Sequence, residues 1–151
     1  MTAIVHVDAN VLIYTHDASH EKKRARAVEW LDGLWKERAG RISAQVLAEF
    51  FNVSTQYLKP GLPPERALLE VAAYQGWQPL PTSVELLLKA AGVFQRFKLS
   101  WWDSIIVASA VEQGCTHLLT EDMQHGQSIG SLTIINPFHI APQALLSHSR
   151  S

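Results

Sequence analysis

Hydrophobic and polar positions follow two patterns along this chain, which together predict short strands interleaved with helices. Apolar and β-branched runs typical of buried strands occupy residues 3–7, 41–43, 117–120 and 132–135, with a weaker candidate at 77–80. Apolar positions at helical spacing predict helices at 20–38, 44–58, 64–74, 82–94 and 101–114. This alternation favours an α/β fold in which a parallel sheet is covered by helices on both faces.

Local signals mark where several of these helices begin and end. Ser43 is a candidate N-cap, and Thr82 followed by Glu85 forms a capping-box pattern. Pro64 suits the first turn of a helix, and Gly114 is a plausible stop. Residues 121–130 contain glycine and are expected to form a loop.

Length and composition bound the class of protein. The chain has 151 residues, 47% of them hydrophobic, which suits one domain over residues 1–146 with a frayed tail at 147–151. Lys and Arg number 13 against 14 Asp and Glu, so any binding of a polyanion must be local. The single cysteine excludes a disulfide framework within the chain, and no run approaches the ~18 apolar residues of a membrane span. We therefore expect a cytoplasmic protein.

Two acidic residues stand beyond predicted strands. Asp8 interrupts an apolar run at residues 4–14, and Asp122 follows the strand at 117–120. A carboxylate in apolar surroundings is costly unless it is hydrogen-bonded, paired or bound to a metal. Each acid could cap the element that follows it. Binding sites in open α/β sheets, however, form beyond the carboxyl ends of the strands, where both acids would lie.

Two further acids fall on the buried side of predicted helices. Glu49 has Val46 three residues before it and Val53 four after it. Asp103 lies in the first turn of its helix, and the residues three, four and seven positions later are apolar. Taken singly, Glu49 could pair with an arginine and Asp103 could complement the helix dipole. Taken with the two acids at the strand ends, they favour one shared site.

Four converging acids predict a metal site. Hard divalent cations such as Mg²⁺ take oxygen ligands and are commonly held by a few carboxylates, water and substrate phosphate. Without the cation the acids would repel one another and their pKa values would rise. A metal held in this way lowers the pKa of a bound water and neutralises charge on a leaving oxygen. The pattern therefore predicts metal-dependent hydrolysis of phosphodiesters.

Four segments, read in order, carry a resemblance to a known family. They are V-D-A-N-V-L-I-Y, A-E-F-F-N-V, L-S-W-W-D-S-I-I-V-A-S-A and L-L-T-E-D-M-Q-H-G, and they resemble the PIN-domain ribonucleases, specifically the VapC-like toxins of bacterial toxin-antitoxin pairs. The resemblance implies a three-layer α/β/α PIN-like domain around a central parallel sheet, with Mg²⁺- or Mn²⁺-dependent endoribonuclease activity. It also implies a toxin that inhibits translation or growth, a small VapB-like antitoxin as partner, and a homodimer.

The same resemblance assigns roles to individual residues. The acidic quartet, as catalytic residues and metal ligands, is matched by Asp8, Glu49, Asp103 and Asp122. Asn10 and Thr120 match positions expected to hold these acids or a water in place. The family sometimes carries a further acid beside the third one, where this chain has Ser104, so the number of metal ions stays open.

Basic and aromatic residues are candidates for contact with RNA. On a helix, Lys22, Lys23 and Arg26 would form a positive patch that could follow an RNA backbone, although Glu29 could pair with Arg26. Trp102 could stack on an unpaired base. A solvated helix face and packing in the core are the alternatives.

Other functions fit parts of the pattern. Asp8 could be the nucleophile of a phosphatase or phosphotransfer domain, but that pattern expects a second aspartate where Asn10 stands. No G-x-G-x-x-G or G-x-x-x-x-G-K-[ST] motif for nucleotide cofactors occurs. A non-catalytic binding module would be expected to lack one or more of the four acids. A PIN-like nuclease that processes RNA or cuts DNA also fits, because the metal chemistry does not require a 2′-hydroxyl.

Overall fold

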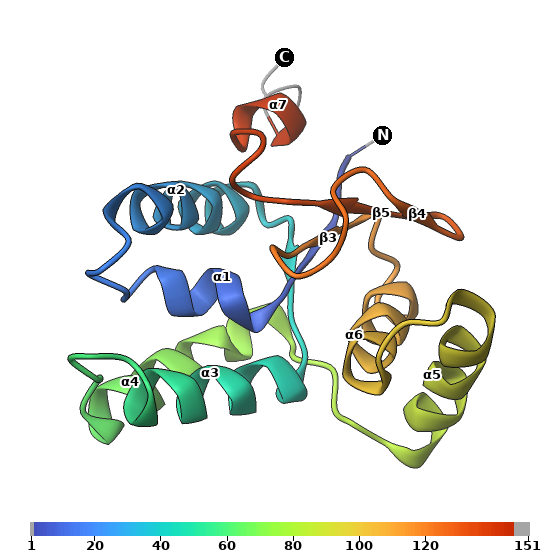
Figure 1. The fold of residues 1–151 in the computed structure, drawn as a ribbon, viewed down its shortest axis with the longest axis horizontal. Helices are drawn as coiled ribbons and strands as arrows, with labels where there is room; N and C mark the ends of the chain where they lie inside the picture. The colour runs from blue at the N-terminus through green and yellow to red at the C-terminus, as the bar shows by residue number, and fades with distance from the viewer. Residues whose placement is uncertain (1, 147–151) are drawn as a thin grey trace.

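The central feature of the computed structural model, which describes residues 2–146, is a five-stranded sheet of order β2-β1-β3-β5-β4 (Figure 1). The strands are β1 (Val5–Val7), β2 (Gly40–Arg41), β3 (His117–Leu119), β4 (Ser128–Ile129) and β5 (Leu132–Ile135). Neighbouring strands are parallel except β4 and β5, which pair antiparallel. The predicted α/β class and parallel sheet are confirmed, with one antiparallel edge strand added.

Helices flank this sheet. They are α1 (Ala9–Tyr14), α2 (Glu21–Glu37), α3 (Ala44–Gln56), α4 (Pro64–Ala73), the 3-10 turn η1 (Tyr74–Trp77), α5 (Val84–Phe97), α6 (Trp101–Glu112) and α7 (Gln143–Leu146). The α5–α6 pair lies apart from the group formed by α1 to α4 (Figure 1). The sequence predicted the long helices to within a few residues at each end.

Side-chain caps fix two of these helix starts. Ser43 accepts a hydrogen bond from the backbone N–H of Val46 at 3.3 Å, as expected for the N-cap of α3. At α5 the cap is Ser83, whose hydroxyl accepts from the N–H of Leu86 at 3.1 Å. The expected cap at Thr82 is therefore wrong by one position. Thr82 matches the capping-box pattern through Glu85, but Ser83 is the residue whose extended backbone leads into the helix and whose hydroxyl reaches a free N–H.

Two short segments differ from the expectation. The weak strand expected at residues 77–80 is not formed, because its first residue ends the turn η1 and only Leu80 pairs, in a single parallel bridge with Ser43. The expected loop at 121–130 contains β4, which Gly130 joins to β5 at a φ of 62°. A strand of two residues is too short to show any alternation of polar and apolar positions.

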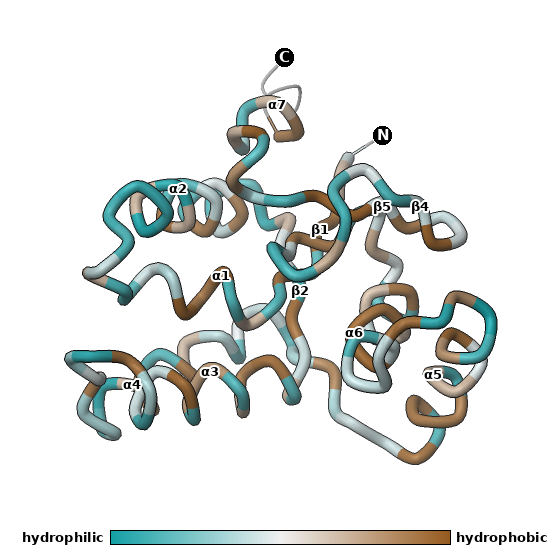
Figure 2. Tube along the Cα trace, in the orientation of Figure 1, coloured by the Kyte–Doolittle hydropathy of each residue, from teal (hydrophilic) through white to brown (hydrophobic). Residues whose placement is uncertain are grey.

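The main hydrophobic core lies between the sheet and its helices. Hydrophobic residues concentrate on the strands and α6, whereas much of α2 is hydrophilic (Figure 2). Trp30 of α2 is fully buried, and its indole N–H donates to the carbonyl of Pro137 at 3.0 Å. This contact ties the segment after β5 to α2. Helix α6 is buried from Ser104 to Ala110, whereas its first residues, which include the exposed Trp102, lie nearer the surface.

Two expectations concern the extent of the folded unit. A single domain over residues 1–146 stays a prediction, and the expected frayed tail at 147–151 lies outside the described residues. Within residues 2–146, no helix is both long and apolar enough to cross a membrane.

Candidate active site

The four predicted acids meet in one pocket at the carboxyl ends of β1 and β3. Asp8 directly follows β1, Asp122 lies in the segment after β3, Glu49 comes from α3, and Asp103 from the first turn of α6. The pocket has a volume of about 350 Å³ and is lined by these acids together with Gln45, Trp102 and Ile106. Elements far apart in the sequence therefore bring the predicted quartet together.

Asp8 is the most buried of the four acids and has a double role. It is the N-cap of α1, because its Oδ1 accepts from the N–H of Ala9 at 2.7 Å, and its Oδ2 accepts from the Thr120 hydroxyl at 2.9 Å. Burial raises the pKa of Asp8 to about 6. The two hydrogen bonds lower this pKa, and the nearby charges of Glu49 and Asp122 raise it further. Asp8 thus caps α1 and also lines the pocket that contains the other three acids.

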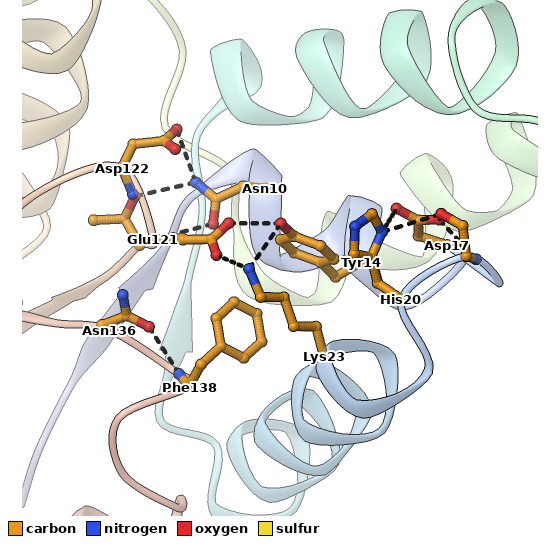
Figure 3. Close-up of polar contacts among 11 residues, drawn as sticks. Asn10, Tyr14, Asp17, His20, Lys23, Glu121, Asp122, Asn136 and Phe138 are labelled. Carbon is orange, nitrogen blue, oxygen red and sulfur yellow. Dashed lines mark hydrogen bonds and ion pairs between the residues drawn. The ribbon is translucent and has the colours of Figure 1, made fainter.

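Asn10 contacts Asp122, which follows β3 (Figure 3), and its NH₂ also lies 3.4 Å from Oδ2 of Asp8, which follows β1. Its side-chain NH₂ lies 3.1 Å from Asp122 Oδ2 and 3.1 Å from the Thr120 hydroxyl. Its carbonyl oxygen accepts from the N–H of Glu121 at 3.2 Å. The N–H of Asp122 in turn donates to the Thr120 hydroxyl at 3.1 Å. Asn10 and Thr120 thus hold the segment after β3 beside the first strand.

Glu49 and Asp103 line the same pocket from helices α3 and α6. Glu49 is exposed as a residue, yet partial burial of its carboxyl is the first cause that raises its pKa, followed by the charges of Asp122 and Asp103. Burial also raises the pKa of Asp103, with a further rise from Asp122 and an opposing hydrogen bond with Ser100. The acids therefore destabilise one another's charged forms when no cation is near.

Gln45 is a pocket residue that the sequence patterns did not mark. It lies one turn before Glu49 on the same face of α3. Its side-chain carbonyl oxygen is buried and has no hydrogen-bond partner among the residues the structure describes. The only sequence signal for Gln45 as a site residue was its position four residues before Glu49. Because an uncharged amide is common on a helix surface, that spacing alone did not single it out.

Lys23 is held in a network beside the site (Figure 3). Its ammonium forms an ion pair with Glu121 and lies 5.2 Å and 5.1 Å from the ring centroids of Tyr14 and Phe138. The Tyr14 hydroxyl donates to Glu121 at 2.7 Å. Glu121 directly precedes Asp122, so this network fixes the loop that carries an acid. No local pattern reveals a pairing between residues 98 positions apart.

The remaining candidates occupy different settings. Trp102 is 67% exposed at the wall of the acidic pocket. Lys22 is exposed, and Arg26 pairs with Glu29 at 3.3 Å, the pairing weighed from the sequence. Ser104 is fully buried, and its hydroxyl donates to the carbonyl of Ser100 at 2.8 Å within α6. A role in RNA contact or beside the acids stays a prediction for these residues.

The donor set of the pocket fits a hard divalent cation. Its lining offers carboxylate and amide oxygens and includes no basic side chain. Burial is the first cause of the raised pKa values of Asp8, Glu49 and Asp103, and the charges of neighbouring acids raise each of them further. Within residues 2–146, no three His, Cys, Asp or Glu side chains stand close enough to hold an ion by themselves. Mg²⁺ characteristically keeps several water molecules alongside one or two carboxylates.

Comparison with known proteins gives one match to a family and several to solved structures. The family model described as PIN domain matches residues 5–127. No curated protein matches the chain by sequence. Among solved structures, the chain is similar to a toxin-antitoxin complex from Klebsiella pneumoniae, with a TM-score of 0.63 and 19% identity over 88% of this chain and 97% of that one.

Two further solved structures share the fold. VapC20 from Mycobacterium tuberculosis, described as a sarcin-ricin loop cleaving toxin, has a TM-score of 0.55 and 17% identity over 76% of this chain and 86% of its own. VapBC2 from Rickettsia felis, bound to a DNA fragment from their promoter, has a TM-score of 0.53 and 15% identity over 87% and 96%. At these identities the likeness shows the fold alone.

Proposed function

This chain belongs to the PIN-domain family, as its sequence resemblance predicted, and from that premise we propose that it is a metal-dependent endoribonuclease. The family and the likeness to toxin structures support a nuclease. The observation that carries the proposal is the pocket in which Asp8, Glu49, Asp103 and Asp122 meet without a basic side chain. Such a pocket suits cleavage of a phosphodiester through a bound cation.

The proposed cofactor is Mg²⁺ or Mn²⁺, which one or two of the four acids would ligate directly and the others through bound water. When bound, the metal would supply a water of lowered pKa and neutralise charge on the leaving oxygen. The protein's own contribution is positional. Thr120 and Asn10 hold Asp8 and Asp122 at hydrogen-bonding distance, and Ser104 is proposed to stabilise the first turn of α6. A preorganised site avoids the cost of reorienting these groups during the reaction.

The proposed substrate is RNA, with contacts on both sides of the acids. Trp102 is exposed at the pocket wall, where its ring can stack on an unpaired base next to the scissile phosphate. Lys22, Lys23 and Arg26 are the proposed contacts with the backbone, and Lys22 is the most available because the other two are paired. Hydrolysis of a bond within the RNA chain follows as the reaction.

The proposed biological role is that of a VapC-like toxin that inhibits translation or growth in the cytoplasm, with a small VapB-like antitoxin as its partner. The likeness to a toxin-antitoxin complex and to VapBC2 supports an antitoxin. A homodimer belongs to the same proposal. Exposed apolar side chains on α4 and α5 offer surface for protein partners, and they include Leu68, Leu69, Val84 and Leu88.

Cleavage of a mixed pool of structured RNAs tests the activity directly. The purified protein is assayed with Mn²⁺, with Mg²⁺ and with EDTA, alongside Asp103→Asn and the matched control Asp32→Asn, whose acid lies exposed on α2. We expect cutting that requires the metal, is kept by Asp32→Asn and is lost in Asp103→Asn. A folded protein that cuts no RNA would contradict the proposal.

The same assay separates the alternatives. Single-stranded DNA of equal length tests whether the nuclease acts on DNA or on both nucleic acids, and a phosphate monoester tests phosphatase chemistry. We expect RNA to be preferred over both. In the structure, the position of the second phosphatase aspartate is held by Asn10, whose NH₂ donates to Asp122 and Thr120. A carboxamide neither gains nor loses a proton near neutral pH, so the phosphatase reaction lacks its general acid.

A further inference from the structure

A second pocket, of about 500 Å³, lies beside the edge strand β2. It shares no lining residue with the acidic pocket. Its walls come from the C-terminal end of α2, from β2 and from the segment around η1. This volume falls within the range of sites that hold small molecules.

One wall of this pocket is aromatic and rigid. The rings of Trp35 and Trp77 lie with centroids 4.8 Å apart at an angle of 43°. Trp77 packs so closely on β2 that a Cβ added to Gly40 would lie 2.3 Å from its ring. Trp77 is nearly buried, whereas Trp35 is 39% exposed. The wall therefore presents a fixed indole surface to any ligand in the pocket.

Two arginines, Arg38 and Arg41, bring positive charge to the same pocket. Arg41 donates from Nη1 to the carbonyl of Gly40 at 2.8 Å and, more weakly, to that of Arg38 at 3.4 Å. These bonds orient one edge of the Arg41 guanidinium. Neither Arg38 nor Arg41 forms an ion pair with an acid in the part of the chain that the structure describes. The pocket thus carries two positive charges without an anion.

The backbone of this pocket is unusual at two positions. Arg38 has a φ of 55° and Gln78 a φ of 52°, so both adopt the left-handed conformation that favours glycine. Both residues line the same pocket. Arg38 is the C-cap of α2 and Gln78 is the C-cap of η1, and a left-handed residue is a common way for a helix to end.

We propose that this pocket binds a nucleotide, with the base against Trp35 and the phosphate against Arg38 and Arg41. A planar base stacks on an indole, and a guanidinium matches phosphate with two parallel hydrogen bonds. A free nucleotide and a nucleotide within single-stranded RNA present this same chemistry. The site uses none of the four acids and needs no metal, so this proposal can be tested independently of the nuclease proposal.

Calorimetric titration of the full chain in EDTA tests the proposal, because EDTA keeps the acidic pocket free of metal. The ligands are GMP, guanosine and a single-stranded RNA of eight nucleotides. The first variant is Arg38→Gly, which removes the guanidinium and places glycine where the backbone favours it, so the fold should be kept. Arg41→Ala is the second variant, and Arg66→Ala, an exposed arginine on α4, is the matched control.

We expect saturable binding of GMP or of the RNA that is weaker by about tenfold or more in Arg38→Gly and in Arg41→Ala, and unchanged in Arg66→Ala. Guanosine should bind much more weakly than GMP, since it lacks the phosphate. Equal binding of GMP and RNA would assign a free nucleotide, and binding of the RNA alone would assign an RNA strand. Absence of binding to the wild type would overturn the proposal, and so would an affinity of both arginine variants equal to that of the wild type.

Discussion

The Thr120 hydroxyl donates to Asp8 Oδ2 at 2.9 Å, across 112 positions of sequence. The same oxygen accepts from the N–H of Asp122 and from the NH₂ of Asn10, both at 3.1 Å. One hydroxyl therefore links the ends of β1 and β3 and sets the environment of two acids. Its bond lowers the pKa of Asp8 against the rise caused by burial.

Thr120→Val should raise the pKa of Asp8 above its value of about 6, because it removes the hydrogen bond that favours the carboxylate. A hydrogen bond to a charged group contributes roughly 1.5–3 kcal/mol, so affinity for Mn²⁺ at neutral pH should fall by about tenfold or more. Cleavage should reach half its maximum at a higher pH. Titration with Mn²⁺ and a pH profile measure both, and Thr133→Val in β5 is the matched control. Identical pH profiles for Thr120→Val and the wild type would show that the Thr120 hydroxyl does not affect the pKa of Asp8.

Asp103→Asn should leave the metal-free protein equally stable or slightly more stable. The charge of Asp122 raises the pKa of Asp103, so the substitution removes a repulsion. In saturating Mg²⁺ the order should reverse, because binding to the folded state stabilises the wild type by about 2.7 kcal/mol at a hundred times the dissociation constant. Melting temperatures with EDTA and with Mg²⁺ give the comparison, with Asp32→Asn as control. A severe loss of stability in EDTA would point to a structural ion pair instead.

Two buried groups should give opposite dependences of stability on pH. Burial lowers the pKa of His6 to about 4, against a raising hydrogen bond with Gln113, from an ordinary value of 6.5. Below pH 6.5 the unfolded chain takes up a proton that the folded chain refuses, so acid destabilises the fold, by about 3 kcal/mol at pH 4. Asp8 acts in reverse, since its raised pKa stabilises the fold as pH falls from about 6 toward its ordinary value of 3.8.

The measurement is the free energy of unfolding in EDTA between pH 4 and pH 7. In Asp8→Asn the compensating group is absent, so stability should fall more steeply toward pH 4 than in the wild type. Adding His6→Asn should flatten that dependence, whereas adding His139→Gln, at an exposed site, should not. Parallel curves for Asp8→Asn and the wild type would show that Asp8 does not titrate in this range.

Two glycines offer a matched pair for the packing of β2. A Cβ at Gly40 would lie 2.3 Å from the Trp77 ring, so Gly40→Ala must displace a nearly buried indole and should cost about 1–3 kcal/mol. Nothing lies within 4 Å of a Cβ at Gly92 in α5, so Gly92→Ala should stabilise by up to about 1 kcal/mol. Chemical denaturation measures both. A Gly40→Ala variant as stable as the wild type would mean that the Trp77 ring can move aside at no cost.

Patterns near in sequence predicted the fold well, whereas contacts distant in sequence escaped them. The helical periods of α2, α3 and α6 and the cap at Ser43 depend on neighbours within a turn, and all were found. The strand β4 was missed because its two residues carry no period. Its assignment as a strand depends on antiparallel pairing with β5, which no pattern within β4 itself reveals.

The residues of the candidate site also separate into those that a local sequence pattern marked and those that only the tertiary fold reveals. The acids were found because each interrupts an apolar pattern at a strand end or on a helix face. Gln45 was missed because a neutral amide on a helix needs no partner in the sequence, although its oxygen is buried without one in the structure. The pairing of Lys23 with Glu121 joins α2 to the loop after β3 and depends entirely on the tertiary fold.

The acidic pocket draws its four acids from residues 8 to 122, which gives it an order of assembly during synthesis. A growing chain that ends before Asp122 holds at most three of them, and the loop after β3 that carries Asp122 is set in place by Thr120 and Asn10. A ribosome therefore has to release most of this domain before the pocket exists. Any activity that needs all four acids therefore begins only after Asp122 has left the ribosome.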